Sequence, residues 1–133
     1  MASKMAVGAQ HCPCGSDTHY ASCCARYVRG ETPAPTAEAL MRSRYSAFAL
    51  GEETYLLASW HPKTRPSKVR LDPAQKWIGL SIKSTEQGGA ADETGVVEFV
   101  ARFKVDGKGH RLHEKSRFEQ IEGQWYYLEG DHL

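Results

Sequence analysis

The fold is decided by the stretch VVEFVARFKV, residues 96–105, in which apolar and polar side chains alternate. A period of two places the apolar side chains on one face of an extended strand, and β-branched and aromatic residues are typical of strands. Residues 77–86, WIGLSIKSTE, show the same alternation. Both segments are therefore predicted to be strands of one sheet.

Turn dipeptides connect the strand over 96–105 to two further strands. Asp106-Gly107 leads into a third apolar-polar segment over 110–121, and Glu122-Gly123 leads into a fourth over 124–128. Such dipeptides readily adopt the positive φ that tight hairpins need. The second half of the chain is therefore predicted to be an antiparallel meander.

Two helices are predicted before the sheet. Thr36 is a good N-cap, and the run AEALMRSRYSAFAL that follows it is predicted to end near Gly51. Its apolar side chains recur every three or four residues and form one stripe, made of Leu40, Met41, Tyr45, Phe48 and Ala49. A second helix is predicted from Glu52 to Trp60, since Pro62 disfavours a longer one.

Helices followed by a run of strands predict an α+β domain in which the helices cover one face of an antiparallel sheet. Residues 61–73 are basic and proline-rich, so we interpret them as a loop. Gly79 allows a local bend in its strand. Since two helices must cover four long strands, we expect a curved, cone-shaped sheet with an apolar pocket beneath it.

Four cysteines lie close together in CPCGSDTHYASCC, residues 12–24, with the spacing C-x-C-x8-C-C. Two thiolates on one turn and two on a returning segment can complete a tetrahedron around one zinc ion. Cys12, Cys14, Cys23 and Cys24 are therefore the predicted metal ligands. Four thiolates leave no open position for substrate, so the predicted zinc is structural, with one ion per chain.

Other interpretations of this cluster remain open at the sequence level. His11 and His19 flank the cysteines, and either could replace one of them as a ligand. A vicinal disulfide between Cys23 and Cys24 would require strained geometry. An iron-sulfur cluster is less favoured, because a first spacing of one residue departs from the common ferredoxin patterns.

The segment 30–35 contains two prolines and a glycine, which indicates a stiff linker. We therefore expect a flexible tail over 1–10, a metal-binding element over 11–30 and a main domain over 36–133.

The net charge of +1 and the ordinary hydrophobic content of 41% give no reason to expect a nucleic-acid or membrane partner. Residues 1–10 lack the apolar run of a signal peptide, and no stretch is apolar and long enough to span a membrane. We therefore expect a cytoplasmic protein, whose clustered cysteines are reduced and bind metal.

The cysteine segment resembles the SEC-C zinc motif, which occurs at the C-terminus of the SecA translocation ATPase and in many small bacterial proteins. The remaining chain is similar to the uncharacterised YchJ family, in which this motif precedes a domain resembling nuclear transport factor 2. The similarity lies in LMRSRYSAFALG at 40–51, YLLASWHP at 55–62 and HEKSRFEQIEGQWYYLEG at 113–130. It implies a cone-shaped fold and, through SEC-C, a role in binding other proteins.

Candidate pocket residues are polar or aromatic side chains near the expected cone. They are Arg42, Tyr45, Trp60, His61, Glu114 and Arg117. By strand alternation, Glu114 shares a face with Phe118, while Arg117 lies on the other face. The simplest interpretation of Arg42 and Arg44 is that one pairs with a carboxylate such as Glu114 and the other is solvated.

Three classes of function stay open. No familiar nucleophile, phosphate-loop, dinucleotide or metalloprotease motif occurs, so a non-enzymatic role is favoured. The leading hypothesis is a protein-interaction module that docks through the zinc element. The alternatives are a small-molecule binder or enzyme that uses the cone pocket, and a ribosome- or RNA-associated protein that uses the basic loop with Lys63 and Arg65. Oligomeric state is not predicted.

Overall fold

The computed structural model describes residues 11–133, so the tail predicted over 1–10 lies outside it. Its helices are a 3-10 helix, η1 (Tyr20–Ser22), and the α-helices α2 (Ala25–Val28), α3 (Ala37–Leu50) and α4 (Glu53–Ala58). Its strands are β1 (Gln75–Gln87), β2 (Thr94–Val105), β3 (Lys108–Ile121) and β4 (Gln124–His132). None of the helices in residues 11–133 has the length and hydropathy of a membrane span.

The strands form one sheet in the order β1-β2-β3-β4, and each neighbouring pair is antiparallel, so the predicted meander is confirmed. The fourth strand is longer than predicted, because its polar end pairs with β3 as far as His132, opposite Glu114. The pattern of apolar residues does not predict backbone pairing by a polar segment. The predicted α+β class, with helices on one face of a curved antiparallel sheet, is correct.

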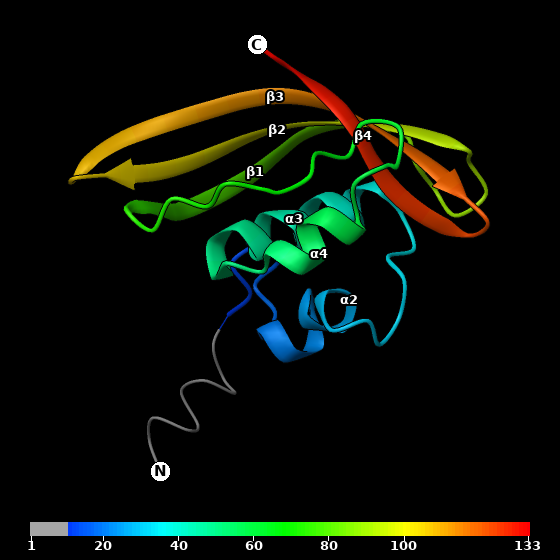
Figure 1. Ribbon diagram of the computed structural model, residues 1–133, viewed down its shortest axis with the longest axis horizontal. Coiled ribbons are helices and arrows are strands. Elements are labelled where there is room, and N and C mark those ends of the chain that lie inside the picture. The colour runs from blue at the N-terminus through cyan, green and yellow to red at the C-terminus, as the bar shows by residue number, and fades with distance from the viewer. Residues whose placement is uncertain (1–10) are drawn as a thin grey trace.

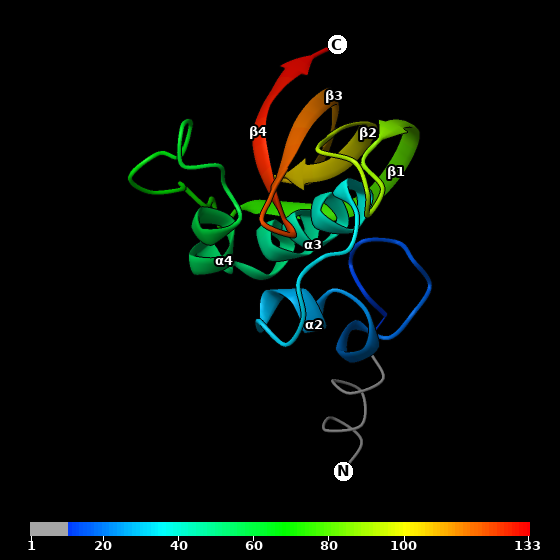
Figure 2. The same cartoon turned by 90° about the vertical axis from the view of Figure 1, so that its right-hand side faces the viewer.

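The sheet bends over the helices, as Figures 1 and 2 show. Register shifts interrupt β1 between Trp77 and Gly79 and again between Ile82 and Ser84, and another lies next to Phe118 in β3. Bulges of this kind bend a strand and increase its twist. One of the irregularities therefore lies at the glycine where the sequence predicts a bend.

Helix α3 is the middle layer of the molecule. Its ends agree with the prediction: Thr36 Oγ1 accepts a hydrogen bond from the Ala39 N–H at 3.0 Å, and Gly51 ends the helix with φ 76°. The sheet covers one side of α3, and the cysteine segment lies on the other (Figure 1). Ser46 and Ala47 are therefore fully buried although they lie outside the predicted apolar stripe.

The concave face of the sheet carries the main hydrophobic core. Large side chains from the sheet, among them Phe99, Phe118 and Trp125, pack against Leu40 and Tyr45 of α3. These residues are at most 4% exposed. Close packing of aromatic rings thus fills the space in which the sequence suggested a pocket.

Helix α4 is shorter than predicted, and the chain after it lies beside the edge of β4. The N–H of His61 donates to the carbonyl of Tyr127 at 2.7 Å, and the N–H of Tyr127 donates to the carbonyl of Ser59 at 2.9 Å. His61 is only 3% exposed, so the start of the predicted loop is in fact packed structure. This short pairing covers a strand edge that would otherwise be open.

Candidate metal centre

The cysteine segment folds back on itself so that its two ends meet. The N–H of Cys12 donates to the carbonyl of Thr18 at 2.7 Å, and Gly15 turns the chain between them with φ 81°. Cys23 follows η1, and Cys24 is the N-cap residue of α2. The sequence did not predict these two helices, because helices of three and four residues show no period.

The four sulfur atoms converge on one point. The Sγ atoms of Cys12, Cys14, Cys23 and Cys24 all lie within 4.8 Å of one another, and none of the four is in a disulfide. The Sγ atoms of Cys14 and Cys23 are 3.7 Å apart. A tetrahedral zinc ion with Zn–S bonds of about 2.3 Å places its ligand sulfurs about 3.8 Å apart. The predicted residues therefore form a cluster that could hold a metal ion.

Hydroxyl groups line the outside of this cluster. Ser16 Oγ lies 3.1 Å from the sulfur of Cys23, and Ser46 Oγ of α3 lies 3.4 Å from the sulfur of Cys12. Cys12, Cys14 and Cys24 are at most 4% exposed. Hydrogen bonds to ligand sulfurs fix their orientation and tune their charge.

The crowded sulfurs influence one another's ionisation. Hydrogen bonds from the thiols of Cys12 and Cys24 lower the pKa of Cys14, whereas hydrogen bonding with Cys12 and Cys14, together with burial, raises the pKa of Cys24. Burial also raises the pKa of Cys23. A bound cation would favour the thiolate form of its ligands.

The two histidines that flank the cluster are placed elsewhere. His11 and His19 are exposed, and their rings stack on each other with centroids 5.9 Å apart. His11 Nδ1 lies 3.4 Å from Asp17 Oδ1. Within residues 11–133 the group of possible metal ligands contains four cysteines and neither histidine.

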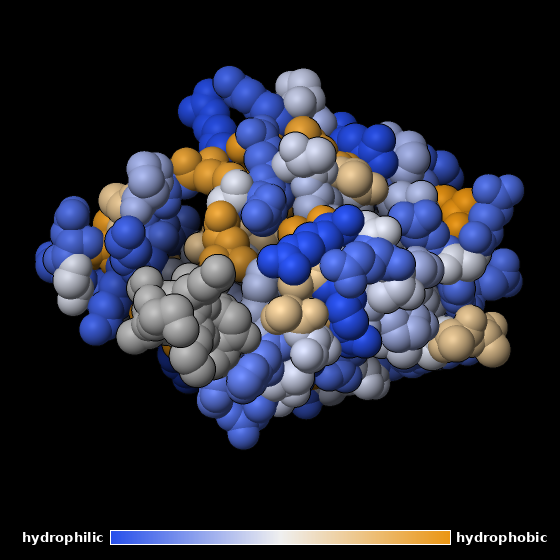
Figure 3. Space-filling view, turned by 90° about the horizontal axis from the view of Figure 1, so that it is seen from below, coloured by the Kyte–Doolittle hydropathy of each residue, from blue (hydrophilic) through white to orange (hydrophobic). Residues whose placement is uncertain are grey.

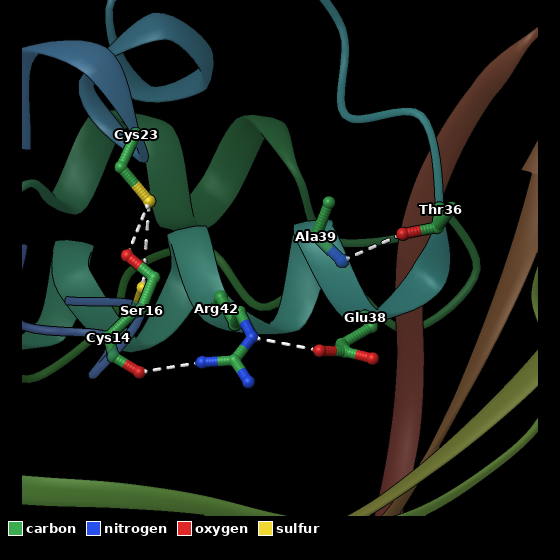
Figure 4. A network of polar contacts seen from close by, with 7 residues as sticks. All are labelled: Cys14, Ser16, Cys23, Thr36, Glu38, Ala39 and Arg42. Atoms are coloured by element: carbon green, nitrogen blue, oxygen red, sulfur yellow. Dashed lines mark hydrogen bonds and ion pairs between the residues drawn. The ribbon is translucent and has the colours of Figure 1, made fainter. Parts of the chain in front are cut away.

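Arg42 ties the cysteine cluster to α3 (Figure 4). Its Nη1 donates to the carbonyl of Cys14 at 2.8 Å, and its Nε donates to Glu38 Oε2 at 2.9 Å. Burial works against the charge of Arg42, but hydrogen bonds with Glu38 and Cys14 more than offset it and raise the pKa of the guanidinium. This predicted pocket residue therefore lies beside the metal site, outside the cone.

The other predicted pocket residues are distributed over the fold. Tyr45 packs edge-on against Trp77 in the core, and burial raises its pKa to about 12. Trp60 packs against Tyr127, and its indole N–H is buried without a partner. The Nε2 atom of His61 lies 2.7 Å from Glu119 Oε1.

Glu114 and Arg117 lie on opposite faces of β3, as alternation predicts. Glu114 Oε1 accepts a hydrogen bond from the buried Ser116, which shares its face, whereas Arg117 forms ion pairs with Asp131 and Glu129. The structure thus does not bring the six predicted residues into one pocket. Their approximate position in the fold follows from sequence, but their neighbours depend on contacts between distant segments.

Arg44, which the sequence left open as solvated or paired with Glu114, is the buried arginine of α3. Its Nη1 donates to the carbonyl of Leu56 and to Ser59 Oγ, and its guanidinium lies against the rings of Trp60 and Tyr127. Burial lowers its pKa to about 10. Two aromatic faces, one backbone carbonyl and one hydroxyl compensate this charge instead of a carboxylate in direct contact.

A groove of about 980 Å³ opens between the cysteine segment and the main domain. Tyr20, Tyr27 and Pro33 line it from the first part of the chain, and Tyr55 and Trp125 line it from the second. The indole N–H of Trp125 is buried without a partner. None of the six predicted pocket residues lines this groove, because it arises only where two distant segments meet.

Comparison with known proteins agrees with this architecture. The middle domain of YchJ, which is NTF2-like, matches residues 36–130. A UPF0225 protein of Chromobacterium violaceum is 58% identical over 123 residues, which is 90% of each chain. A UPF0225 protein of Streptomyces coelicolor is 50% identical over 92% of this chain and 95% of its own.

Two solved structures have the same fold. The solution structure of a SEC-C motif containing protein from Rhodopseudomonas palustris matches with a TM-score of 0.81 and 32% identity, over 92% of this chain and 98% of that one. The crystal structure of a SEC-C motif containing protein from Psychrobacter arcticus matches with a TM-score of 0.79 and 28% identity, over 92% and 82%.

Proposed function

We propose that this chain, which belongs to the YchJ family of UPF0225 proteins, is a zinc-binding docking protein. In this proposal Cys12, Cys14, Cys23 and Cys24 hold one structural zinc ion. The ion stabilises the cysteine segment, which then forms one wall of the groove described above. The partner is a segment of another protein that binds in this groove.

The convergence of four thiols carries the zinc part of the proposal. Sulfur-only ligation favours zinc over hard cations such as magnesium or calcium. Four thiolates would complete a tetrahedral shell, so the ion would have no position for a reacting water. Its role would be to stabilise the fold, since small zinc elements gain much of their folding free energy from the metal.

The groove supports the docking part. It combines the aromatic side chains of Tyr20, Tyr27 and Tyr55 with backbone and polar groups, a lining that suits a segment of another protein. On the face that carries the cysteine segment, hydrophilic residues predominate and apolar ones form small separate spots (Figure 3). Such a surface suits reversible docking better than a permanent, largely apolar interface.

Metal analysis of reduced, freshly purified protein tests the first part. We expect about one zinc ion per chain, with loss of the ion in Cys23→Ser and retention in the neighbouring control Ser22→Ala. If the protein instead contained iron and absorbed visible light, the cysteines would hold an iron-sulfur cluster and not zinc. Failure to bind zinc on reconstitution, with four reactive thiols, would refute the metal site.

Site-specific photocrosslinking in cells tests the second part. A photoreactive residue at Tyr27, in the groove, should capture one defined protein that the same residue at Glu122, in the β3–β4 turn, does not capture. That protein is then purified and titrated. We expect Tyr20→Ala and Tyr27→Ala to weaken binding at least tenfold, and equal binding by these variants would rule out the groove as the docking site.

A further inference from the structure

Charged residues are unevenly distributed along the sheet, although the net charge of the protein is only +1. Residues 84–98 and 118–128 form one end of the sheet and contain no lysine or arginine. These two segments carry six acidic residues, namely Glu86, Asp92, Glu93, Glu98, Glu119 and Glu122, and the cations Lys115 and Arg117 lie opposite Glu98 and Val96 at the same end. At the opposite end, Asp106 is the only acidic residue within 99–113, which contains four lysines and arginines.

Four of the cations at this second end share one face of the sheet. Lys76 of β1 is directly opposite Lys104 of β2, and Arg102 of β2 is directly opposite Arg111 of β3. Cross-strand partners lie on the same face, and Arg102 and Lys104 are two residues apart on one strand. We call Lys76, Arg102, Lys104 and Arg111 the cationic patch. Figure 1 shows this end of the sheet, with the β2–β3 hairpin, projecting past the helices.

The cationic patch lacks internal compensation. All four side chains are exposed, and within residues 11–133 none of them forms a salt bridge or a side-chain hydrogen bond. Like charges directly opposite each other destabilise a sheet. Arg117, in contrast, pairs with Asp131. Four cations without acidic partners on one face of the sheet suggest an external anion with several negative charges.

An aromatic pocket adjoins the cationic patch. It has a volume of about 410 Å³ and is lined by Phe48, Leu71 and Trp77, together with Lys76 from the patch itself. Trp77 is held in place by Phe103, whose ring centroid lies 5.1 Å away. Trp77 and Phe103 alternate with Lys76 and Lys104, so the pocket lies on the helix-covered face of the sheet, and Lys76 of the edge strand β1 connects it to the patch on the other face. Flat aromatic rings next to several cations are typical of surfaces that bind unpaired bases and phosphates.

We propose that this end of the sheet binds single-stranded nucleic acid. Phosphates contact Lys76, Arg102, Lys104 and Arg111, and an unstacked base enters the pocket beside Trp77 and Phe48. An acidic peptide could match the charges but would leave the aromatic pocket unused. Because the protein as a whole is nearly neutral, the contact is electrostatic and local, and its affinity falls steeply with salt. This site is separate from the groove and from the cysteine cluster.

Fluorescence anisotropy with a labelled 15-nucleotide oligo-uridine tests the proposal. The patch variant combines Arg102→Gln, Lys104→Gln and Arg111→Gln. The matched control combines Lys63→Gln, Lys68→Gln and Arg70→Gln, which removes the same charge from the basic loop. We expect the patch variant to bind at least tenfold more weakly at low salt, while the control stays within threefold of the unmodified protein. The slope of log K against log salt should become shallower by about 2, since each phosphate contact on a single strand contributes about 0.7.

Two further probes separate the proposed ligand from other anions. An abasic phosphodiester of the same length should bind several-fold more weakly than oligo-uridine, and polyglutamate should compete poorly. The patch variant should also unfold at no lower urea concentration than the unmodified protein, because it loses repulsive pairs. Equal binding by the patch and control variants, equal binding of the abasic strand or a duplex, or efficient competition by polyglutamate would each overturn the proposal.

Discussion

Arg42 is one of the residues that connect the candidate metal site to the main domain. Its two hydrogen bonds reach the Cys14 carbonyl and Glu38. We predict that Arg42→Met lowers the free energy of unfolding by roughly 1 to 2 kcal/mol, because a charged donor is lost and the buried carbonyl of Cys14 is left without it. Metal affinity, measured by competition with a chromogenic chelator, should fall about tenfold, since contacts behind the ligands hold them in place.

Glu38→Gln is the matched control for Arg42. It removes the ion pair on the surface of α3 but leaves the hydrogen bond to Cys14 intact. Exposed pairs between residues four apart contribute only about 0.3 to 0.5 kcal/mol. If Glu38→Gln weakened metal binding as much as Arg42→Met, the bond to Cys14 would not be the cause.

Sequence could predict that the four cysteines come together, because all four lie within 13 positions of the chain. A cluster so local constrains its own geometry. The neighbours of Arg42 and Arg44 could not be predicted in the same way. The hydrogen-bond partners of these arginines outside α3 lie 12 to 28 positions away, and only the packing of α3 between two layers decides which arginine is buried.

At the scale of elements, the start of α3 packs against the turn between β1 and β2. The N–H of Ala37 donates to the carbonyl of Gly88 at 2.9 Å. A Cβ on Gly95 would lie 2.6 Å from the Gly88 Cα and 2.9 Å from the Ala37 Cβ. Neither backbone can move without breaking this junction. We predict that Gly95→Ala lowers the free energy of unfolding, measured with urea, by roughly 1 to 3 kcal/mol.

Gly79→Ala provides the contrast to Gly95→Ala. No atom lies within 4 Å of a Cβ built on Gly79, and its φ is not in the left-handed region. Alanine restricts the unfolded chain more than glycine, so this variant should be neutral or more stable by up to about 1 kcal/mol. Similar losses in both variants would show that the sheet tolerates no side chain at either position, and would contradict a specific role for the α3 junction.

Long periodic elements were predictable, whereas short and paired ones were not. The strand over 96–105 and the helix after Thr36 carry ten or more residues of consistent period, and both occur where predicted. The helix at Ala25–Val28 is too short to have a period. The pairing of Trp60 with Tyr127 depends on backbone hydrogen bonds between distant segments. The pattern of side chains along the sequence does not predict such bonds.

At the scale of the whole molecule, buried tyrosines make the stability of the fold depend on pH in the alkaline range. Burial raises the pKa values of Tyr45, Tyr55 and Tyr127 to about 12. Unfolded tyrosines ionise near pH 10, so the folded state holds these protons more tightly. The stabilisation is complete below about pH 10 and is lost as the pH rises through about 12.

Absorbance at 295 nm, recorded with circular dichroism, measures this linkage. We predict that part of the tyrosine signal changes only near pH 12, together with loss of structure. Tyr55→Phe should reduce the loss of stability between pH 10 and 12, although it also removes the 2.6 Å hydrogen bond to Ser43. Ionisation of all tyrosines near pH 10 with the fold intact would refute the burial argument.

Removal of the metal should show how far the two parts of the molecule depend on each other. The cysteine segment covers the side of α3 on which Ser46 is fully buried, and Leu80 of β1 packs against the cysteine cluster. We predict that a chelator disorders residues 11–34 and lowers the melting temperature of the main domain by several degrees, since a ligand that binds only the folded state stabilises it.

Amide NMR spectra before and after chelation test this prediction in residue detail. Signals of the cysteine segment should collapse, those of α3 should shift, and those of β2 and β3 should remain dispersed, because the core around Phe99 and Phe118 does not include the cysteines. Unshifted α3 signals would mean that the cysteine segment is attached without supporting the main domain. Collapse of the sheet would mean that the α3 surface under the cysteines is required for the whole fold. If metal binding shapes the groove while the core stays folded, the α3 signals should shift and the signals of β2 and β3 should stay dispersed.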